Sequence, residues 1–298
     1  MDKRLLLIIN PAAGTKKANR YLTDIVSLFN AKGYLCTVFC TAARGDAIQI
    51  VQENAQGCGL IVCIGGDGTL NEVISGLLLS GLHIPIGYIP AGSTNDFANS
   101  LGLSRDILTA AQDIMEGTPM PLDAGSFNGR NFSYVASFGA FTEASYATPQ
   151  SSKNILGHLA YVLEGVKDLP NIRPVHLALQ AGGQSFEGDY IFGAVSNATS
   201  IGGVLSLDKQ TVSLNDGLFE IILIKSPQNF AELNRIVISL QTRQYDRDLI
   251  TFLMADRVEI QANPNMPWTL DGEYAPGCQD ILVENLHNAI QLMLRQER

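Results

Sequence analysis

Several features that mark membrane-spanning, secreted or zinc-binding proteins are missing from this 298-residue sequence. No stretch of about 18 consecutive apolar residues occurs, which argues against a membrane-spanning helix. Residues 1–10 form a short apolar run without the longer apolar region and small-residue cleavage site of a secretory signal. The cysteines number five and include no Cys-x-x-Cys pair, which disfavours a zinc site and a disulfide framework. We therefore expect a cytoplasmic protein.

Positive charge is also scarce. Lys and Arg total 20 against 29 for Asp and Glu, which gives a formal net charge of -9 and a pI of about 4.9. Nucleic-acid binders usually carry a basic face, so no nucleic-acid partner is expected. Contact with an anionic membrane would have to depend on local apolar surface or local Lys and Arg. The chain is 46% hydrophobic, and its length allows one large core or two domains of ordinary size.

Over the first 120 residues or so, apolar runs alternate with amphipathic segments. The spacing predicts strands at 5–9, 35–41, 60–64 and 86–89, and helices at 22–29, 46–56, 70–79, 95–101 and 104–116. Ser104 is placed to cap the last of these helices. Strands that alternate with helices favour a parallel sheet covered on both faces. We therefore predict a three-layer α/β domain over residues 1–122.

After about Pro121 the pattern changes to short alternating apolar runs between Gly, Asn and Asp turns. This pattern predicts mostly antiparallel strands, near 132–138, 175–180, 190–196, 219–224 and 257–261. Two helices are predicted within this region, near 154–169 and 230–242. We expect a β-rich, β-sandwich-like domain over residues 123–283, with residues 284–298 packing back on the first domain.

The strongest local motif is Ile64-Gly65-Gly66-Asp67-Gly68-Thr69, where a buried strand turns into a helix. Its glycines allow close approach of the backbone to a ligand, and the helix start offers unpaired N–H groups to a phosphate. Asp67 suits a phosphate site if Mg²⁺ lies between them, since Mg²⁺ is commonly held by one or two carboxylates plus phosphates. The alternative is a tight strand-to-helix turn without a ligand.

Two further loops follow strands and precede helices. Residues 10–14 read Asn-Pro-Ala-Ala-Gly and are not a Walker loop, although Lys16, Lys17 and Arg20 follow. Residues 90–97 read Pro-Ala-Gly-Ser-Thr-Asn-Asp-Phe, which suits contacts to phosphate or ribose but also ordinary helix capping. In open α/β sheets, ligands collect at the carboxyl ends of the strands. Three such loops on one edge therefore favour a nucleotide site there.

A fourth motif, Leu270-Asp271-Gly272-Glu273, lies in the β-rich half. Asp271 and Glu273 could supply a magnesium ligand and the general base that a kinase uses on the attacking hydroxyl. A solvated hairpin turn is the alternative. Asp123, Asp208 and Asp216 form a further acidic set, and Asp216 fits a simple Asn-Asp-Gly turn.

These four motifs, in this order and at this spacing, resemble the diacylglycerol kinase catalytic domain family. Residues 65–69 with Asn71-Glu72 look like its nucleotide loop, and residues 10–14 look like its N-terminal loop. Residues 92–98 look like its Gly-Thr-x-Asn-Asp-Phe-Ala stretch, and residues 271–273 like its Asp-Gly-Glu. The resemblance spans nearly the whole chain and is to the Gram-positive type. It implies an NAD-kinase/diacylglycerol-kinase-like fold, a nucleotide-binding first domain and a lipid-substrate second domain.

The resemblance also implies roles for individual residues. The implied ATP contacts are Asn10, Pro11, Ala12, Ala13, Gly14, Thr41, Gly65, Gly66, Asp67, Gly68, Thr69, Leu70, Asn71, Glu72 and Thr94. Glu273 would be the proton acceptor, and Asp67, Asp96 and Asp123 would organise catalytic Mg²⁺ through waters. A structural Mg²⁺ would use Asp216 with backbone oxygens of Ser213 and Leu218. A homodimer is also implied.

The predicted function is transfer of the ATP γ-phosphoryl group to a hydroxyl of diacylglycerol or a related lipid, with peripheral contact at the inner face of the membrane. The helix near 154–169, with Phe138, Phe141 and Tyr146 upstream, is the candidate lipid-facing region; the alternative is a helix that packs on the β domain. Two other functions stay open. One is a soluble-substrate kinase of NAD-kinase type, and the other is a non-catalytic nucleotide or lipid sensor.

Overall fold

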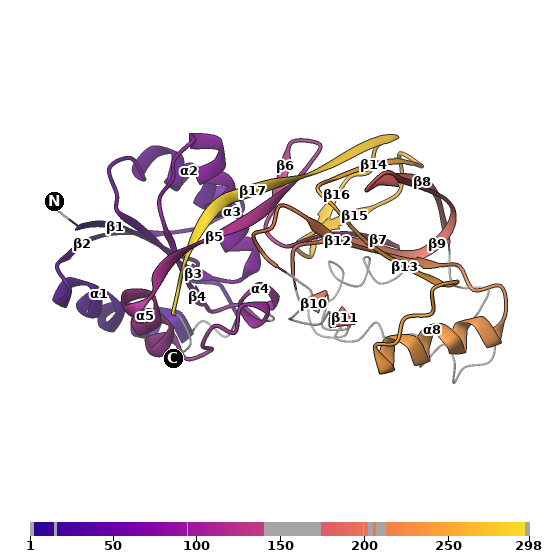
Figure 1. Ribbon diagram of the computed structural model, residues 1–298. Helices are drawn as coiled ribbons and strands as arrows, with labels where there is room; N and C mark the ends of the chain where they lie inside the picture. The colour runs from indigo at the N-terminus through magenta and orange to yellow at the C-terminus, as the bar shows by residue number, and fades with distance from the viewer. Residues whose placement is uncertain are drawn as a thin grey trace. The chain divides into compact units, whose positions relative to one another are not determined.

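The computed structural model describes residues 3–14, 17–93, 95–139, 174–198, 200–201, 205–206 and 213–295 (Figure 1). It divides into two compact units, Met1–Ala124 with Asn288–Arg298, and Gly125–His287. Two strands, β5 (Thr118–Phe127) and β17 (Asp280–Leu294), have residues in both units.

The first unit alternates strands and helices as its sequence predicts. Its elements are β1 (Lys3–Ile9), the 3-10 helix η1 (Lys17–Tyr21), α1 (Leu22–Ala31), β2 (Tyr34–Cys40), α2 (Asp46–Asn54), β3 (Leu60–Gly65), α3 (Asp67–Ser80), β4 (Ile86–Pro90), α4 (Asp96–Ser100) and α5 (Ile107–Glu116). The strands run parallel in the order β4-β3-β1-β2. At the far side of β4, Leu292 of β17 pairs in parallel with Ile86.

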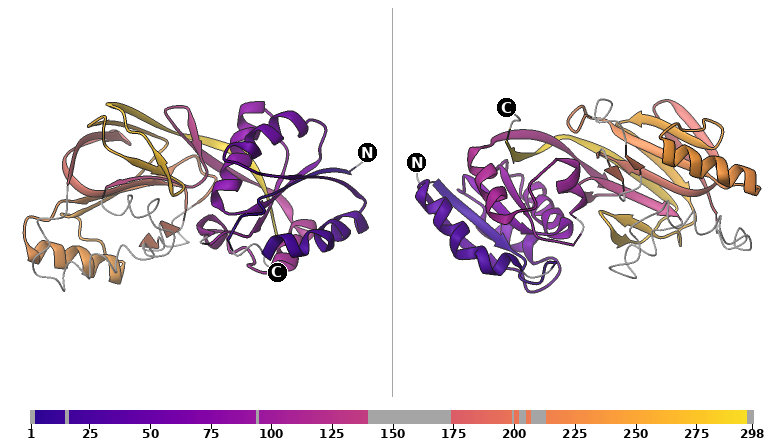
Figure 2. Two further views of the ribbon diagram at one scale, coloured as in Figure 1. Left: turned by 180° about the vertical axis from the view of Figure 1, so that it is seen from behind. Right: turned by 90° about the horizontal axis from the view of Figure 1, so that it is seen from below.

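Helices cover both faces of this sheet. Figures 1 and 2 show α2 and α3 on one face, with α1 and α5 on the other. The strands are apolar on both faces, and β1, β3 and β4 are buried almost throughout. One core cluster joins alternate strand residues to the buried faces of α1 and α5, among them Phe29 and Ile114. The arrangement is three-layered.

The start of α5 differs in detail from the prediction. Its N-cap is Asp106, whose side chain accepts hydrogen bonds from the N–H and hydroxyl of Thr109 at 2.9 and 2.8 Å. Ser104 instead accepts a hydrogen bond from the Asp106 N–H at 3.2 Å. Both residue types are good N-caps, so composition alone could not place the first helical turn.

The second unit is mostly antiparallel β structure. Its elements are β6 (Arg130–Phe132), β7 (Val135–Gly139), β8 (Val175–Ala181), β9 (Gln184–Ser196), β10 (Ser200–Ile201), β11 (Leu205–Ser206), β12 (Phe219–Lys225), α8 (Phe230–Thr242), β13 (Ile250–Ala255), β14 (Arg257–Ala262), β15 (Trp268–Leu270) and β16 (Glu273–Ala275). Its main strand order is β16-β15-β7-β9-β8-β14-β17, and β12 pairs with both β9 and β13. The predicted fold class is thus confirmed.

The core of the second unit is aromatic. Trp268 is fully buried, and its ring lies 5.0 Å from that of Phe127 and 4.9 Å from that of Phe138. Phe138 is therefore a core residue and not part of a lipid-facing surface. The predicted helix near 154–169, with Phe141 and Tyr146, lies outside the described residues.

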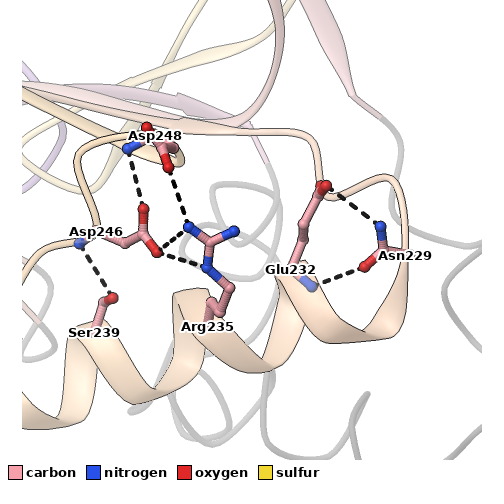
Figure 3. Close-up of polar contacts among 6 residues, drawn as sticks. All are labelled: Asn229, Glu232, Arg235, Ser239, Asp246 and Asp248. Atoms are coloured by element: carbon pink, nitrogen blue, oxygen red, sulfur yellow. Dashed lines mark hydrogen bonds and ion pairs between the residues drawn. The ribbon is translucent and has the colours of Figure 1, made fainter.

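Side-chain contacts fix the start of α8 and tie the loop that follows to the helix (Figure 3). Asn229 caps the helix by accepting the Glu232 N–H at 2.9 Å, while its amide donates to the Glu232 carboxylate at 3.3 Å. Arg235 donates to Asp246 at 2.7 Å and to Asp248 at 3.3 Å, which ties the following loop to the helix. These contacts are exposed, and they account for where the helix begins and where the following loop lies rather than for a ligand site.

Candidate active site

Three loops meet at the carboxyl ends of β1, β3 and β4. The Asn10 N–H donates to Ile64 O at 2.9 Å, and the Ala91 N–H donates to Gly65 O at 2.7 Å. The Asn10 side chain donates to the Thr69 hydroxyl at 3.1 Å and accepts the Ala12 N–H at 3.0 Å. The three motifs predicted from separate parts of the sequence therefore form one hydrogen-bonded platform.

Glycines allow these loops to pack backbone against backbone. Gly14 has a φ of +51°, and a Cβ there would lie 2.4 Å from Ala91 O. A Cβ on Gly92 would lie 2.6 Å from Gly66 Cα and 2.7 Å from Asn95 Oδ1. No side chain fits such gaps without moving backbone. The glycines are therefore required because the loops pack backbone against backbone. The sequence alone does not reveal this requirement.

Asn95 closes the third loop. Its φ is 54°, in the left-handed region that asparagine tolerates better than most residues. Its side-chain oxygen accepts the Gly92 N–H at 2.9 Å, and its amide donates to Gly92 O at 3.0 Å. Thr94, a predicted ATP contact, lies outside the described residues.

The start of α3 suits an anion. This 14-residue helix has Gly66 as its N-cap, and no side chain there accepts a hydrogen bond from the first turn. The first N–H groups and the positive end of the helix dipole therefore face the platform, which favours phosphate. Gly68 and Thr69 lie in this turn. Leu70 does not join them, because its N–H donates to Gly66 O at 3.1 Å and its side chain is fully buried.

Asp67 links two helix starts. It is the first residue of α3, and its carboxylate accepts the Asp96 N–H at 2.9 Å and the Phe97 N–H at 3.3 Å at the start of α4. Burial raises the pKa of the neighbouring Asp96 carboxyl, and a nearby cation would offset that desolvation. The pair fits Mg²⁺ shared with phosphates.

Glu72 shapes a neighbouring loop. Its two carboxylate oxygens accept the N–H groups of Gly45 at 2.7 Å and Ala47 at 3.1 Å, at the start of α2. The preceding loop begins at Thr41, which is nearly buried and donates its N–H to Ile9 O at 2.9 Å. Both residues were predicted to contact ATP. The geometry gives Glu72 a positioning task, holding the loop that carries Thr41, while its contact with ATP stays a prediction.

Asp123 is completely buried in β5, in the part of that strand that belongs to the first unit. Its Oδ1 accepts the Asn288 N–H at 2.7 Å, where Asn288 has a φ of 51°. This contact holds β17 at the residue whose backbone adopts the left-handed conformation. Asp123 thus has a structural bond in addition to its predicted place in the acidic network.

In the second unit, Asp271 and Glu273 have different surroundings. Asp271 is buried, with a φ of 51°, and its carboxylate accepts three backbone N–H groups, from Ser133, Tyr134 and Val135 at 2.6, 3.0 and 3.1 Å. Glu273 is partly exposed, and its carboxylate lies 3.6 Å from the Arg130 guanidinium. Asp271 is therefore suited to anchor the turn, while the Glu273 side chain is partly exposed.

The Asn-Asp-Gly turn is ordered by its own side chains. Asp216 accepts the Leu218 N–H at 3.0 Å, and the Ser213 hydroxyl donates to Asn215 at 3.1 Å. The described residues contain no cluster of three or more His, Cys, Asp or Glu side chains that could hold a metal ion. A metal at this turn would therefore need backbone oxygens. Asp208 lies outside the described residues.

Glu220 is a buried acid that the sequence motifs do not single out. Its side chain is fully buried in β12, and no described residue gives either carboxylate oxygen a hydrogen-bond partner. Burial, with a smaller contribution from Asp216, raises its pKa to about 8. It pairs across the sheet with Ser196, which is also fully buried. The available signal was one charged residue inside the apolar run Phe219–Lys225.

None of the described helices is long and apolar enough to cross a membrane.

Two family models match the chain. The diacylglycerol kinase catalytic domain matches residues 4–127, and the YegS C-terminal NAD kinase beta sandwich-like domain matches residues 135–293.

Similar proteins cover nearly the whole chain. A diacylglycerol kinase of Bacillus subtilis is 35% identical over 99% of this chain and 98% of that protein. One of Staphylococcus carnosus is 32% identical over 92% of this chain and 90% of its own length. A crystal structure assigned as a diacylglycerol kinase of Bacillus anthracis matches with a TM-score of 0.80 and 26% identity, over 98% of this chain and 95% of that one.

Proposed function

The chain belongs to the diacylglycerol kinase family and is a lipid kinase, and from this premise we propose that it transfers the γ-phosphoryl group of ATP to a hydroxyl of diacylglycerol or a related lipid, with Mg²⁺. We assign the nucleotide to residues 1–122 and the lipid acceptor to residues 123–283. The observation that carries the proposal is the uncapped start of α3 inside the three-loop platform.

The platform supports ATP binding in two ways. The first-turn N–H groups of α3 would bind phosphate oxygens, and the loops locked by Asn10 and Asn95 would keep those groups oriented. Asp67 and Asp96 would hold Mg²⁺, which neutralises phosphate charge when bound. Because Asp67 is fixed by the start of α4, its carboxylate would keep its orientation without the nucleotide.

Glu273 is the proposed proton acceptor. Its carboxylate is accessible and close to Arg130, whose positive charge orients it. Asp271 supports Glu273 indirectly, by fixing the two-residue turn between β15 and β16 through three hydrogen bonds. General-base catalysis typically contributes about 10²–10⁴-fold. We therefore expect Glu273→Gln to lower turnover by about that factor and to leave ATP affinity nearly unchanged.

The lipid acceptor determines where the reaction takes place. A diacylglycerol stays in a bilayer, so we propose a peripheral encounter at the inner membrane face, with a homodimer as the working assembly. Co-sedimentation with liposomes that contain diacylglycerol tests the encounter, and light scattering tests the assembly. Binding should depend on the acceptor lipid more than on anionic lipid, since the net charge of the chain is -9.

The test is phosphoryl transfer from radiolabelled ATP with Mg²⁺, across dispersed diacylglycerol, monoacylglycerol, phosphatidylglycerol, undecaprenol and a sphingoid base. NAD serves as the soluble comparison. We expect transfer to diacylglycerol or to one of the other lipids and none to NAD. Transfer to NAD alone, or no transfer to any acceptor by a folded protein that binds ATP, would contradict the proposal.

A further inference from the structure

The hairpin of β5 and β6 places an arginine beside the proposed proton acceptor. A two-residue turn, Asn128-Gly129, joins the two strands and has φ values of 47° and 82°. Asparagine and glycine accept the left-handed backbone that such a tight turn requires. Arg130 follows directly. Two residues later, Phe132 is fully buried, and its ring stacks on that of Phe219 with centroids 5.7 Å apart.

The Asn128 side chain ties this hairpin to β17. Its Oδ1 accepts the Leu282 N–H at 2.7 Å, and its amide donates to Asp280 O at 3.2 Å. Its backbone N–H donates to Leu282 O at 2.9 Å. The backbone of Arg130 therefore lies between two fixed points, the turn held by β17 and the buried Phe132. Only the torsions of its side chain remain to be ordered.

The Arg130 guanidinium contacts two successive residues of β16. Its Nη1 donates to Tyr274 O at 3.2 Å, and its Nη2 lies 3.6 Å from Glu273 Oε2. The bond to the backbone carbonyl orients the planar guanidinium, which then presents its second nitrogen to the carboxylate. A lysine carries a single point charge and does not reproduce such a two-point contact. The contact therefore requires an arginine and not only a positive charge.

We propose that Arg130 is a positioning residue that holds the Glu273 carboxylate in the orientation needed to accept the proton of the lipid hydroxyl. The inference rests on the proposed function. The two side chains are 39% and 38% exposed, and an ion pair this exposed contributes little to stability. Its effect is on geometry, because a general base must lie within about 3 Å of the oxygen whose proton it takes.

The size of the effect follows from the rotamers of glutamate. Its first two side-chain torsions each have three staggered positions, about nine combinations in all. Loss of the contact that selects among them, at one torsion or both, lowers the productive fraction about three- to tenfold. The loss should appear in kcat. The KM for ATP should stay unchanged, because the nucleotide is assigned to residues 1–122 and Arg130 lies in the second unit.

The experiment measures kcat and the KM for ATP with dispersed diacylglycerol, Mg²⁺ and radiolabelled ATP, in wild type, Arg130→Gln and Arg130→Lys. The matched control is Arg257→Gln on β14, a strand that does not pair with β16. Arg257 makes closer ion pairs than Arg130, at 2.9 Å to Glu259 and 3.1 Å to Glu284. Arg130→Gln is also combined with Glu273→Gln to complete a double-mutant cycle. Thermal unfolding verifies that each variant is folded.

We expect Arg130→Gln to lower kcat about three- to tenfold at an unchanged KM for ATP. Arg130→Lys should recover only part of this loss, and Arg257→Gln should match wild type. In the Glu273→Gln background, removal of Arg130 should cause no further loss, because a positioning residue acts through the residue that it holds. An unchanged kcat in Arg130→Gln, complete recovery by lysine, or an equal loss in both backgrounds would overturn the role of Arg130. Folded wild-type protein that phosphorylates no lipid would overturn the proposed function, and the role of Arg130 with it.

Discussion

The buried carboxyl of Glu220 predicts an unusual dependence of stability on pH. Its pKa is raised from 4.5 to about 8, first by burial and then by Asp216. The unfolded chain loses this proton near pH 4.5, whereas the folded protein keeps it until about pH 8. The folded state thus holds one more proton in this window, and the free energy of unfolding must fall as the pH rises through it.

The magnitude follows from the two values. Each pH unit between them is worth about 1.36 kcal/mol, so the total is about 5 kcal/mol, and about 3 kcal/mol is already lost at pH 7. Glu220→Gln removes the titration and keeps the shape of the side chain. The variant should therefore resemble wild type near pH 4.5 and become more stable than it by about 3 kcal/mol at pH 7.

The assay is urea unfolding between pH 4.5 and 8.5, with EDTA present so that no metal neutralises the acid. Trp268, the single tryptophan of the chain, is fully buried in the same unit and reports its unfolding by fluorescence. Glu187→Gln is the control, because this β9 side chain is 75% exposed and its loss should leave the pH dependence unchanged. If wild type and Glu220→Gln ran parallel across this range, the burial argument for Glu220 would be refuted.

Three further predictions separate structural from catalytic carboxylates and test the loop packing. Asp271→Asn should lower the free energy of unfolding by about 2–3 kcal/mol, because hydrogen bonds to a charged group are lost. Glu273→Gln should leave the free energy of unfolding within about 0.5 kcal/mol of wild type. Equal stabilities of the two variants in urea would refute the anchoring role of Asp271. Glu72→Gln should weaken ATP binding together with protection of the α2 amides against hydrogen exchange, and weakened binding with α2 intact would instead indicate direct contact. Gly92→Ala should abolish nucleotide binding in a protein that still folds, since the new Cβ meets Gly66 Cα at 2.6 Å; calorimetry that shows normal affinity would contradict the packing.

Much of the fold could be read from periodicity. Strands such as β1 and β3 are continuous apolar runs because helices cover both faces, and the change to alternation after Pro121 indicates antiparallel structure. The loops also follow from sequence, since glycines stand where strands end. Boundaries were less accessible: Asp106 rather than Ser104 caps α5, because both residues satisfy the same local rule.

The partners of the site residues could not be predicted. Asp67 meets the N–H groups of residues about 30 positions away, and Asp271 meets those of Ser133 to Val135 across most of the second unit. Such contacts depend on how strands are ordered in the sheet, which local pattern does not encode. The same holds for Glu220, whose importance comes from its burial and its cross-strand neighbour Ser196. The sequence thus predicted where the candidate site lies. The structure separates the residues that can contact a ligand from the residues that fix the positions of those residues.

The most direct test of the central claim is hydrogen exchange of the wild-type protein with and without ATP and Mg²⁺. We expect slowed exchange at the amides of residues 10–14 and 65–69, at the ends of β1 and β3, and little change along α8. Unchanged exchange in both loops under saturating nucleotide, or protection confined to other segments, would contradict the claim that the start of α3 is the phosphate site.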